Sequence, residues 1–471
     1  MISENVLKEL ESIVNPKNIS TLYRDRLMYS KDTWILPVIK FKDFESLPLP
    51  DVIVWPENSE QVGAILKFAN KYKIPVTPFG GGAAVTGAPM AVKGGIILDI
   101  KKMNKILEIN KTSLTARVQA GIIGENLERR LNRYGLTLCH YPMSITTSTI
   151  GGFLATRASG ILSTKYGNID DMVMGIKVVL PTGELIETKA VPKTSTGPDV
   201  MRLFFGSEGL LGIITELTLK LRKLPEVQRF RVFIFDSIEH AVDAIREFMQ
   251  EDIVPAIVRL YDKQDTAITL GNIGVSEKGN LLILRFDGLK ELVDLQDKLV
   301  TRICEKHHGK MLESWIGEHW WNNRLDQYYR LPDILDEGFA DTIEVAVTWD
   351  KLVDLYYDVV NSMEEAEVLV MAHISHVYPW GAAIYFTFAG DLEEGKDKYI
   401  HLREAWNAAM TAVLRHGGTI SHHHGVGIAR NPWIRKELGS TFELIKKLKH
   451  ALDPNNILNL GKMGMDGVDW P

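Results

Sequence analysis

The order of apolar and polar residues divides the chain into two regions of different texture. In the first region, short apolar runs stopped by proline or glycine alternate with segments whose apolar residues recur every three or four positions. Asn58 or Ser59 can cap the first of these helical segments. The pattern predicts strands at 51–56, 74–79, 94–100, 114–121 and 212–222 and helices at 59–73 and 124–135.

The texture changes near Pro225, after which strands and long helices alternate. The predicted strands are 229–235, 255–262, 280–288, 341–350, 368–375 and 382–390, and the predicted helices are 237–249, one through Cys304, one after Trp349 and one ending at His416. This order predicts an α+β second domain with a mostly antiparallel sheet. We therefore divide the chain into domains 1–225 and 226–416 and a segment 417–471 that returns to the first domain.

Composition narrows the possible classes of function. The formal net charge of −6 gives no reason to expect nucleic acid as a partner. Cys139 and Cys304 match no zinc or redox spacing, which is typical of a reduced, intracellular protein. Residues 1–14 carry acidic side chains and no signal-peptide core, and no apolar run approaches the roughly 20 residues that span a bilayer. We expect a cytoplasmic protein, and peripheral contact with a membrane stays open.

The stretch PFGGGAAVTGA at 78–88 directly follows a predicted strand. Its glycines allow positive φ and close approach of the backbone to a ligand, and successive N–H groups on such a turn can bind a pyrophosphate. The spacing matches neither G-x-G-x-x-G nor a P-loop. Taken alone, the stretch could also be a flexible surface turn.

Two further segments rich in glycine, serine and threonine stand at 141–160 and 206–216. Few of their side chains are large enough to fill a core. Three such segments are what one extended ligand would require if the protein backbone contacts it at several points. A nucleotide cofactor is a ligand of that kind.

Three consecutive histidines, His422, His423 and His424, raise the question of metal binding. If the segment is extended, His422 and His424 face one side and His423 the other, so three ligands to one ion would need a distorted backbone. Scattered core or surface histidines are a second interpretation. Catalysis is the third, because neutral and protonated imidazoles lie close in energy near pH 7 and can pass protons.

Several short motifs occur between about residue 51 and the end of the chain, and their combination is distinctive. They are PFGGG (78–82), TRASG (156–160), YGNIDD (166–171), STGPD (195–199), GSEGLLGIITE (206–216), IYF (384–386), SHHHGVG (421–427) and DPNNI (453–457). This set resembles the FAD-binding oxidases of the vanillyl-alcohol oxidase (PCMH-type) superfamily, and within it the alkylglycerone-phosphate synthases, also called alkyldihydroxyacetonephosphate synthases. The resemblance implies a two-subdomain PCMH-type FAD-binding domain followed by an α/β cap domain.

The same resemblance places an FAD cofactor on the three glycine-rich segments. The expected cofactor-binding residues are Pro78, Phe79, Gly80, Gly81, Gly82, Ala83, Ala84, Pro142, Met143, Ser144, Thr147, Ser148, Gly151, Gly152, Thr156, Arg157, Ala158, Ser159, Glu208, Gly209, Gly212, Ile213 and Ile214. Relatives with covalent flavin commonly carry a histidine just after the glycine loop. Ala83 and Ala84 stand there, so the resemblance implies non-covalent FAD.

Catalytic and substrate-binding residues are implied in the second half. Tyr385 matches the catalytic tyrosine of the synthases, although its pattern alone equally fits an aromatic packed in a sheet. Arg330 matches the arginine that binds the substrate phosphate, and a guanidinium suits a phosphate dianion, although a surface ion pair is the alternative. Arg259 is a second expected substrate ligand, and the strip His422–His424 completes the catalytic set.

A metal ion is not expected. Related 2-hydroxyacid dehydrogenases carry a Glu-His pair and a Gly-Asp-Gly-Asn-x-His segment that helps to bind a divalent metal. Here SHHHGVG and YPWGAAIYF stand in those places, which follows the synthase pattern. His373 and His376 could nevertheless supply nitrogen ligands beside the histidine strip.

The implied activity is exchange of the acyl group of acyl-dihydroxyacetone phosphate for a fatty alcohol through a flavin N5 adduct, a step of ether lipid biosynthesis. The alternative is an FAD-linked dehydrogenase of D-2-hydroxy acids such as lactate or glycolate, and a non-catalytic flavoprotein is a third hypothesis. The expected partner is a phosphorylated, lipid-like small molecule, and a homodimer stays open. The segment between Trp349 and Tyr385 is shorter than in eukaryotic synthases, which leaves the substrate open.

Overall fold

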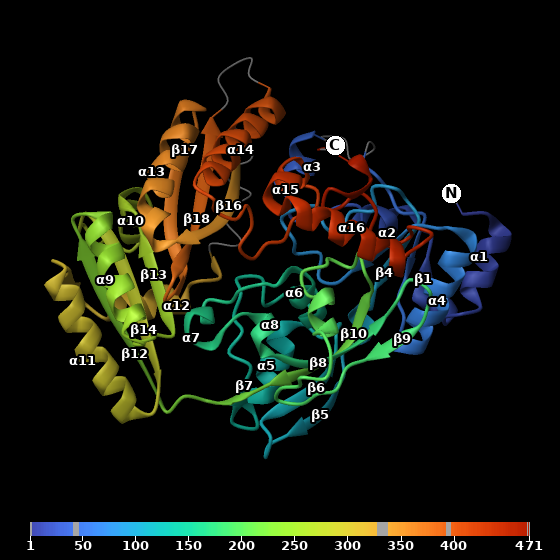
Figure 1. The fold of residues 1–471 in the computed structure, drawn as a ribbon, viewed down its shortest axis with the longest axis horizontal. Coiled ribbons are helices and arrows are strands. Elements are labelled where there is room, and N and C mark those ends of the chain that lie inside the picture. Colours follow the sequence, from blue (N-terminus) through green and yellow to red (C-terminus); the bar gives the residue numbers. More distant parts are fainter. Residues whose placement is uncertain (1, 41–46, 327–337, 392–396, 469, 471) are drawn as a thin grey trace.

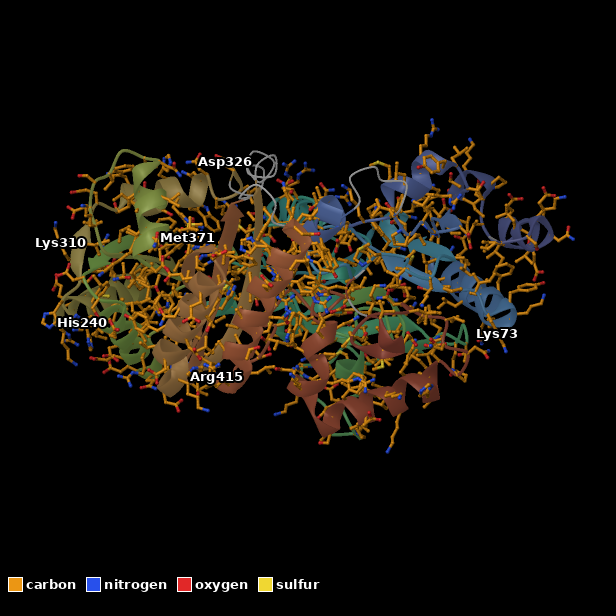
Figure 2. All side chains as sticks on the ribbon, turned by 90° about the horizontal axis from the view of Figure 1, so that it is seen from above. Lys73, His240, Lys310, Asp326, Met371 and Arg415 are labelled. Atoms are coloured by element: carbon orange, nitrogen blue, oxygen red, sulfur yellow. The ribbon has the colours of Figure 1, made fainter. Side chains whose placement is uncertain are left out.

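The structure is a computed structural model that describes residues 2–40, 47–326, 338–391, 397–468 and 470. Figure 1 shows two halves side by side, and one large sheet with its helices makes up the second half. In Figure 2, which is seen from above, Lys73 and Lys310 lie toward opposite ends of the molecule. The elements confirm the expected α+β class.

Two sheets form the framework of the first half. The smaller has the order β1–β2–β4–β3, in which β4 pairs in parallel with β2 and β3. The larger is antiparallel, with the order β5–β6–β10–β8–β9, and β7 pairs separately with β11. The strands are β1 (Ile19–Ser20), β2 (Val52–Val54), β3 (Val76–Phe79), β4 (Ile96–Asp99), β5 (Ile106–Asn110), β6 (Thr115–Gln119), β7 (Leu136–Thr137), β8 (Val173–Val179), β9 (Leu185–Glu187), β10 (Ile213–Lys220) and β11 (Arg222–Lys223).

Local signals explain the longest helix of this half, α4 (Ser59–Tyr72). The side chain of Asn58 accepts a hydrogen bond from the backbone N–H of Gln61, which confirms the expected N-cap, and Lys73 ends the helix in the left-handed conformation. The other helices of this half are α1 (Glu4–Glu11), α2 (Tyr23–Met28), α3 (Ile35–Lys40), α5 (Gly124–Asn132), α6 (Ile150–Thr156), α7 (Ser163–Tyr166) and α8 (Ile169–Met172).

Seven antiparallel strands form the sheet of the second half, in the order β15–β12–β14–β13–β17–β18–β16. This pairing confirms the mostly antiparallel sheet that the sequence predicted. The strands are β12 (Val227–Phe235), β13 (Ile257–Tyr261), β14 (Asn280–Gly288), β15 (Lys310–Leu312), β16 (Gly338–Thr348), β17 (Leu369–Tyr378) and β18 (Gly381–Asp391).

Both faces of the seven-stranded sheet are buried. In β14, Leu281 and Ile283 belong to one apolar cluster, whereas Leu282 and Leu284 belong to another, because alternate side chains point to opposite faces. Helices α9, α11, α13 and α14 pack into the second cluster, and Figure 1 shows α9, α11 and α13 on the outside of the molecule. The helices are α9 (Ile238–Gln250), α10 (Lys263–Gly271), α11 (Lys290–Lys306), α12 (Trp315–Asn322), α13 (Trp349–Glu365) and α14 (Lys398–Arg415). Among the helices of the described residues, none combines the length and apolar character that crossing a bilayer requires.

The residues after Gly417 lie against the first half. Leu458 forms a parallel bridge with Val76 of β3, and the Lys449 ammonium donates a hydrogen bond of 3.1 Å to the carbonyl oxygen of Leu210. The sequence pattern did not indicate the two helices of this tail, α15 (Asn431–Leu438) and α16 (Ser440–Leu452), which lie above the first half in Figure 1.

Four tryptophans join segments that are far apart in the sequence. The ring centroid of Trp470 lies 5.7 Å from that of Trp34 and 5.9 Å from that of Trp406. Trp433 lies 6.3 Å from Trp470. Trp34 directly precedes α3, which contacts α14 and β16, so a segment from the first region of the sequence completes the core of the second half.

Candidate active site

A cavity of about 480 Å³ lies where the three glycine-rich segments meet the seven-stranded sheet. We call it the central cavity. One side is formed by residues from 78–89, 142–161 and 208–214, and we call this side the glycine cradle. The other side is formed by residues of β13, β16, β17 and β18 and by His423 and His424 of the histidine strip.

Close packing of backbone brings the three glycine-rich segments together. A Cβ on Gly81, in the first segment, would lie 2.1 Å from the carbonyl oxygen of Thr147 in the second. Gly209, in the third segment, has φ +79°, and a Cβ there would lie 2.4 Å from the Pro78 ring in the first. The three segments therefore converge on one cavity, as the sequence predicted, and their approach requires glycine.

Most of the expected cofactor-binding residues line the central cavity. They are Pro78, Phe79, Gly80, Gly81, Gly82, Ala83, Ala84, Pro142, Met143, Ser144, Ser148, Gly151, Gly152, Thr156, Ala158, Ser159, Glu208, Gly209, Gly212, Ile213 and Ile214. Thr147 and Arg157 are not among the lining residues. Thr147 lies behind Gly81, and Arg157 ends α6 in the left-handed conformation with its side chain packed at Gly206.

Glu208 lines the cavity, but its carboxylate binds the tail. Its two oxygens accept the backbone N–H groups of Val426 and Gly427, at 2.5 and 2.9 Å. Burial raises the pKa of Glu208, and the two N–H groups act in the opposite direction. Glu208 therefore ties the tail, and with it the histidine strip, to the third glycine-rich segment.

A β-bulge in β17 determines which side chains face the cavity. The pairing with β18 places His373 opposite Tyr385 and His376 opposite Ala383, so Ser375 is the extra residue. Tyr385 and Ala383 are two positions apart and share a face of the sheet. The bulge therefore puts His373 and His376 on that same face, and both line the cavity.

Tyr385 points into the cavity because its neighbours in β18, Ile384 and Phe386, belong to the core on the other face of the sheet. Its ring stacks on that of His373 with 4.9 Å between centroids, and the ring of His424 lies edge-on to it at 5.5 Å. Burial raises the pKa of the Tyr385 phenol to about 12. The phenol therefore keeps its proton at neutral pH.

His373 is held between a cation and a carboxylate. The Arg259 guanidinium can only donate, so Nε2 of His373 accepts its N–H at 2.9 Å, and the ring proton is on Nδ1, 3.3 Å from Oδ2 of Asp265. Burial, followed by the charge of Arg259, lowers the pKa of His373 to about 4. A neutral His373 with a fixed tautomer thus holds Arg259 at the cavity wall.

Glu344 on β16 organises the histidine strip from behind. This carboxylate is fully buried and forms an ion pair with Arg430, which is 1% exposed. Its Oε1 accepts the backbone N–H groups of His423, at 3.1 Å, and of His424, at 2.8 Å. Burial would raise the pKa of Glu344, but the charges of Arg430 and His424 outweigh it and hold the pKa well below its ordinary value.

The histidine strip is turned, not extended. Because one carboxylate oxygen binds two successive N–H groups, the side chains of His422, His423 and His424 do not alternate as in a strand. His423 and His424 line the cavity, whereas His422 does not. Instead, Nε2 of His422 lies 2.8 Å from the hydroxyl of Tyr378. The extended arrangement considered from the sequence is therefore wrong, and the interaction with Glu344 is the reason.

The structure places one of the two expected substrate-binding arginines and does not describe the other. Arg259 lines the cavity, whereas Arg330 lies outside the described residues. Sequence reasoning missed the groups that position the others, namely Glu344 and Asp265, and the bulge at Ser375. Glu344 could not be singled out from the sequence, because β16 carries a second acid, Asp341, three positions earlier.

Two known protein families match most of this chain. Residues 50–189 match the family described as FAD binding domain, and residues 224–463 match that described as FAD linked oxidases, C-terminal domain.

The chain belongs to the FAD-linked oxidases with a PCMH-type FAD-binding domain.

The residues of this FAD-linked oxidase fit its cofactor, FAD. The cradle needs glycine where backbones meet, which leaves room beside them for a flat, extended molecule. Ile100, Ile161 and Ile213 add apolar surface that suits a ring system, and Pro78–Ala84 would hold the pyrophosphate of a bound FAD.

Relatives of this FAD-linked oxidase have two kinds of activity in their names. The alkyldihydroxyacetonephosphate synthase of Caenorhabditis elegans is 32% identical over 496 residues, which cover 97% of this chain and 82% of that protein. The mitochondrial D-lactate dehydrogenase (cytochrome) of Arabidopsis thaliana is 30% identical over 470 residues, which cover 98% and 80%. A solved alkyldihydroxyacetonephosphate synthase structure matches with a TM-score of 0.83 at 27% identity, covering 98% of this chain and 85% of that chain.

Proposed function

We propose that this FAD-dependent enzyme exchanges the acyl group of an acylated dihydroxyacetone phosphate for a long-chain alcohol. The bond between the substrate carbon and the acyl oxygen breaks, the fatty acid leaves, and the alcohol oxygen forms an ether at the same carbon. The alcohol proton passes to the departing carboxylate, so the exchange involves no net oxidation. When bound, FAD supplies the electron-accepting ring system that makes this carbon reactive.

The observation that carries the proposal is the chemistry of the wall opposite the glycine cradle. We call it the imidazole wall: His373, His376, Tyr385, His423 and His424. Among the described lining residues Arg259 is the one arginine or lysine, and Glu208, the one carboxylate, is already bound to backbone N–H groups. Such a wall suits a substrate with one anionic group and a long uncharged chain.

Three residues that line the cavity, Arg259, Tyr385 and His423, have roles that their surroundings support. Arg259, held by His373, binds the phosphate of the substrate. Tyr385 keeps its proton at neutral pH, donates it to the departing carboxylate, and is reprotonated by the proton that His423 takes from the alcohol. Burial lowers the pKa of His423 well below its ordinary value, so this imidazole is neutral and accepts the proton of the alcohol.

The setting of the reaction follows from its substrate. A long-chain substrate makes ether lipid biosynthesis the proposed pathway and peripheral contact with a membrane surface the proposed route to the cavity. Non-covalent FAD is part of the proposal, because the methyl side chains of Ala83 and Ala84 offer no atom for a covalent bond.

Dehydrogenation of a D-2-hydroxy acid is the second candidate. The Arabidopsis relative supports it, because that protein is named a D-lactate dehydrogenase and matches almost the whole chain. In this alternative Arg259 would bind the substrate carboxylate and an imidazole of the wall would accept the hydroxyl proton. The two candidates therefore share residues and differ in the substrate.

Product analysis separates the two candidates. The FAD-loaded enzyme is incubated with acylated dihydroxyacetone phosphate and a long-chain alcohol, and separately with D-lactate or glycolate and a dye acceptor. Ether product without reduction of the dye supports the exchange. Rapid bleaching of the flavin by a hydroxy acid, with no ether product, would overturn it.

Arg259→Lys tests the phosphate contact within the same assay. Lysine keeps the charge but loses the planar fork, so the KM for the phosphorylated substrate should rise by about tenfold. Arg231→Lys is the matched control, because Arg231 also lies on this sheet and pairs with Asp297, away from the cavity. An unchanged KM in Arg259→Lys would remove this residue from substrate binding.

A further inference from the structure

Three imidazoles of the described residues form a compact triangle at the edge of the central cavity. The ring centroids of His376 and His422 are 5.2 Å apart, those of His376 and His423 are 5.1 Å apart, and those of His422 and His423 are 5.2 Å apart. One ring nitrogen from each residue lies within 4.8 Å of the other two. Around a tetrahedral ion with bonds of about 2.0–2.1 Å, such nitrogens would stand roughly 3.3 Å apart, so small side-chain rotations suffice.

We infer that His376, His422 and His423 form a binding site for a divalent transition-metal ion of the Zn²⁺ class. Three imidazole nitrogens are the ligands that Zn²⁺, Co²⁺ and Ni²⁺ prefer, whereas Mg²⁺ and Ca²⁺ prefer oxygen. Metal binding can be tested without the proposed exchange reaction, but the two share His423, so the exchange requires the form of the protein without the ion.

The spacing of His422 and His423 supports the inference. Their Nδ1 atoms lie 3.0 Å apart, close to the separation of two nitrogens bound to one ion. An isolated histidine tripeptide would not reach this arrangement as a strand. The turn imposed by Glu344, which binds the backbone N–H of His423, brings the two Nδ1 atoms to the same place.

His376 supplies the third imidazole, and one of its ring nitrogens has no hydrogen-bond partner in the described structure. It is 6% exposed, and its Nδ1 is buried without a hydrogen-bond partner in the described structure. Burying such a nitrogen without a partner is unfavourable, and a bound cation would be one way to satisfy this side chain. The bulge at Ser375 places the His376 side chain in the triangle, because in a regular strand this side chain would point to the opposite face of the sheet.

Tyr378 completes the site as an orienting group. Its hydroxyl lies 2.8 Å from Nε2 of His422, so Nε2–H can donate to the phenol oxygen and leave Nδ1 free for the ion. Metal-bound histidines commonly donate their second ring N–H in this way. Tyr378 is therefore a positioning residue for His422.

The ion would lie at the edge of the cavity that holds the substrate. His376 and His423 line the central cavity, so an ion between them has its fourth position near the reacting groups. An ion bound at Nδ1 of His423 would leave only Nε2–H at that ring. His423 would then donate a fixed hydrogen bond and could no longer accept a proton through Nδ1.

Direct metal binding tests the inference without any assay of turnover. The FAD-loaded protein is stripped with a chelator and titrated with ZnCl₂ by calorimetry, and with CoCl₂ by absorbance at wavelengths longer than the flavin bands. We expect one ion per chain and the visible bands of tetrahedral Co²⁺. MgCl₂ should produce no binding heat. Absence of Zn²⁺ binding, or octahedral Co²⁺ spectra alone, would overturn the inference.

Variants locate the ion. His376→Ala and His422→Ala should each weaken Zn²⁺ binding by at least about tenfold, and Tyr378→Phe should weaken it by about tenfold or less. His373→Ala is the matched control, because His373 is equally buried on the same face of β17 but outside the triangle, and its affinity should stay within about twofold. Retained flavin absorbance and thermal unfolding show that each variant is folded. Equal losses in His373→Ala and His376→Ala, or no loss in His376→Ala, would place the ion elsewhere and refute the site.

Discussion

The glycine cradle and the imidazole wall enclose the same cavity but are built in opposite ways. The cradle is made by backbone, and its segments meet because glycines such as Gly81 and Gly209 have no Cβ at the points of contact. The wall is made by side chains from β17, β18 and the tail, and their directions depend on buried groups such as Glu344. Changes in the cradle should therefore affect cofactor binding first, and changes in the wall should affect chemistry or local stability first.

Gly81→Ala should have the largest effect on cofactor binding. The added methyl group would lie 2.1 Å from the carbonyl oxygen of Thr147, and two backbones cannot separate without opening the cradle. We expect affinity for FAD to fall by at least about 100-fold, corresponding to roughly 3 kcal/mol, measured as flavin absorbance of the purified protein. Gly271→Ala is the control, because nothing lies within 4 Å of a Cβ there. Full flavin content in Gly81→Ala would show that the cradle tolerates a side chain.

Tyr385→Phe should affect the chemistry of the imidazole wall without affecting cofactor binding by the glycine cradle. Loss of the phenol proton donor should lower the rate of acyl exchange by about 10²–10⁴-fold, while flavin content stays at the wild-type level. Tyr357→Phe is the matched control, since Tyr357 is on the exposed side of α13 and donates to Glu239. A wild-type rate in Tyr385→Phe would exclude this phenol from the chemistry.

Glu344→Gln tests the support behind the wall. Removing one partner of a buried ion pair leaves the charge of Arg430 uncompensated, so the free energy of unfolding of the second half should fall by about 3–5 kcal/mol. Denaturant unfolding followed by tryptophan fluorescence measures this change. The double variant Glu344→Gln with Arg430→Met should recover part of the loss. Unfolding at the same denaturant concentration as the wild type would contradict a structural role for the pair.

The pH dependence of stability should show the smallest effect. Burial and Arg259 lower the pKa of His373 to about 4 in the folded state, whereas an unfolded histidine has a pKa of about 6.5. Below the unfolded pKa the unfolded chain binds the proton that folded His373 refuses, so stability falls as the pH drops from about 6.5 to about 4. The slope from this residue is at most about 1.4 kcal/mol per pH unit. His373→Gln should flatten the profile in that window, and identical profiles would contradict the assignment.

The sequence predicts the cradle better than the wall for a physical reason. Glycine, serine and threonine at 78–88, 141–160 and 206–216 mark a backbone site directly, because few other uses require so little side chain. Thr147, which packs behind Gly81, could not be distinguished from a lining residue, because that distinction depends on tertiary packing.

The side chains of the imidazole wall could not be assigned to one face of the sheet from the alternation of residues along a strand. His373 and His376 are three positions apart, so a regular strand places them on opposite faces. No sequence pattern indicates the β-bulge at Ser375 that puts them on the same face. Glu344 has the position of an ordinary polar residue in an alternating strand. It is fully buried because Arg430 arrives from a segment more than eighty positions later.

The four clustered tryptophans determine the order in which the molecule can be completed. Trp34 precedes Trp470 by more than four hundred positions in the sequence, yet the two rings pack against each other. A nascent chain therefore holds Trp34, Trp406 and Trp433 without the indole that they share. Folding of each half as it emerges, which is usual for long chains, cannot finish the second half in this protein. A chain that has not yet reached Trp470 exposes aromatic surface of the kind that holding chaperones bind.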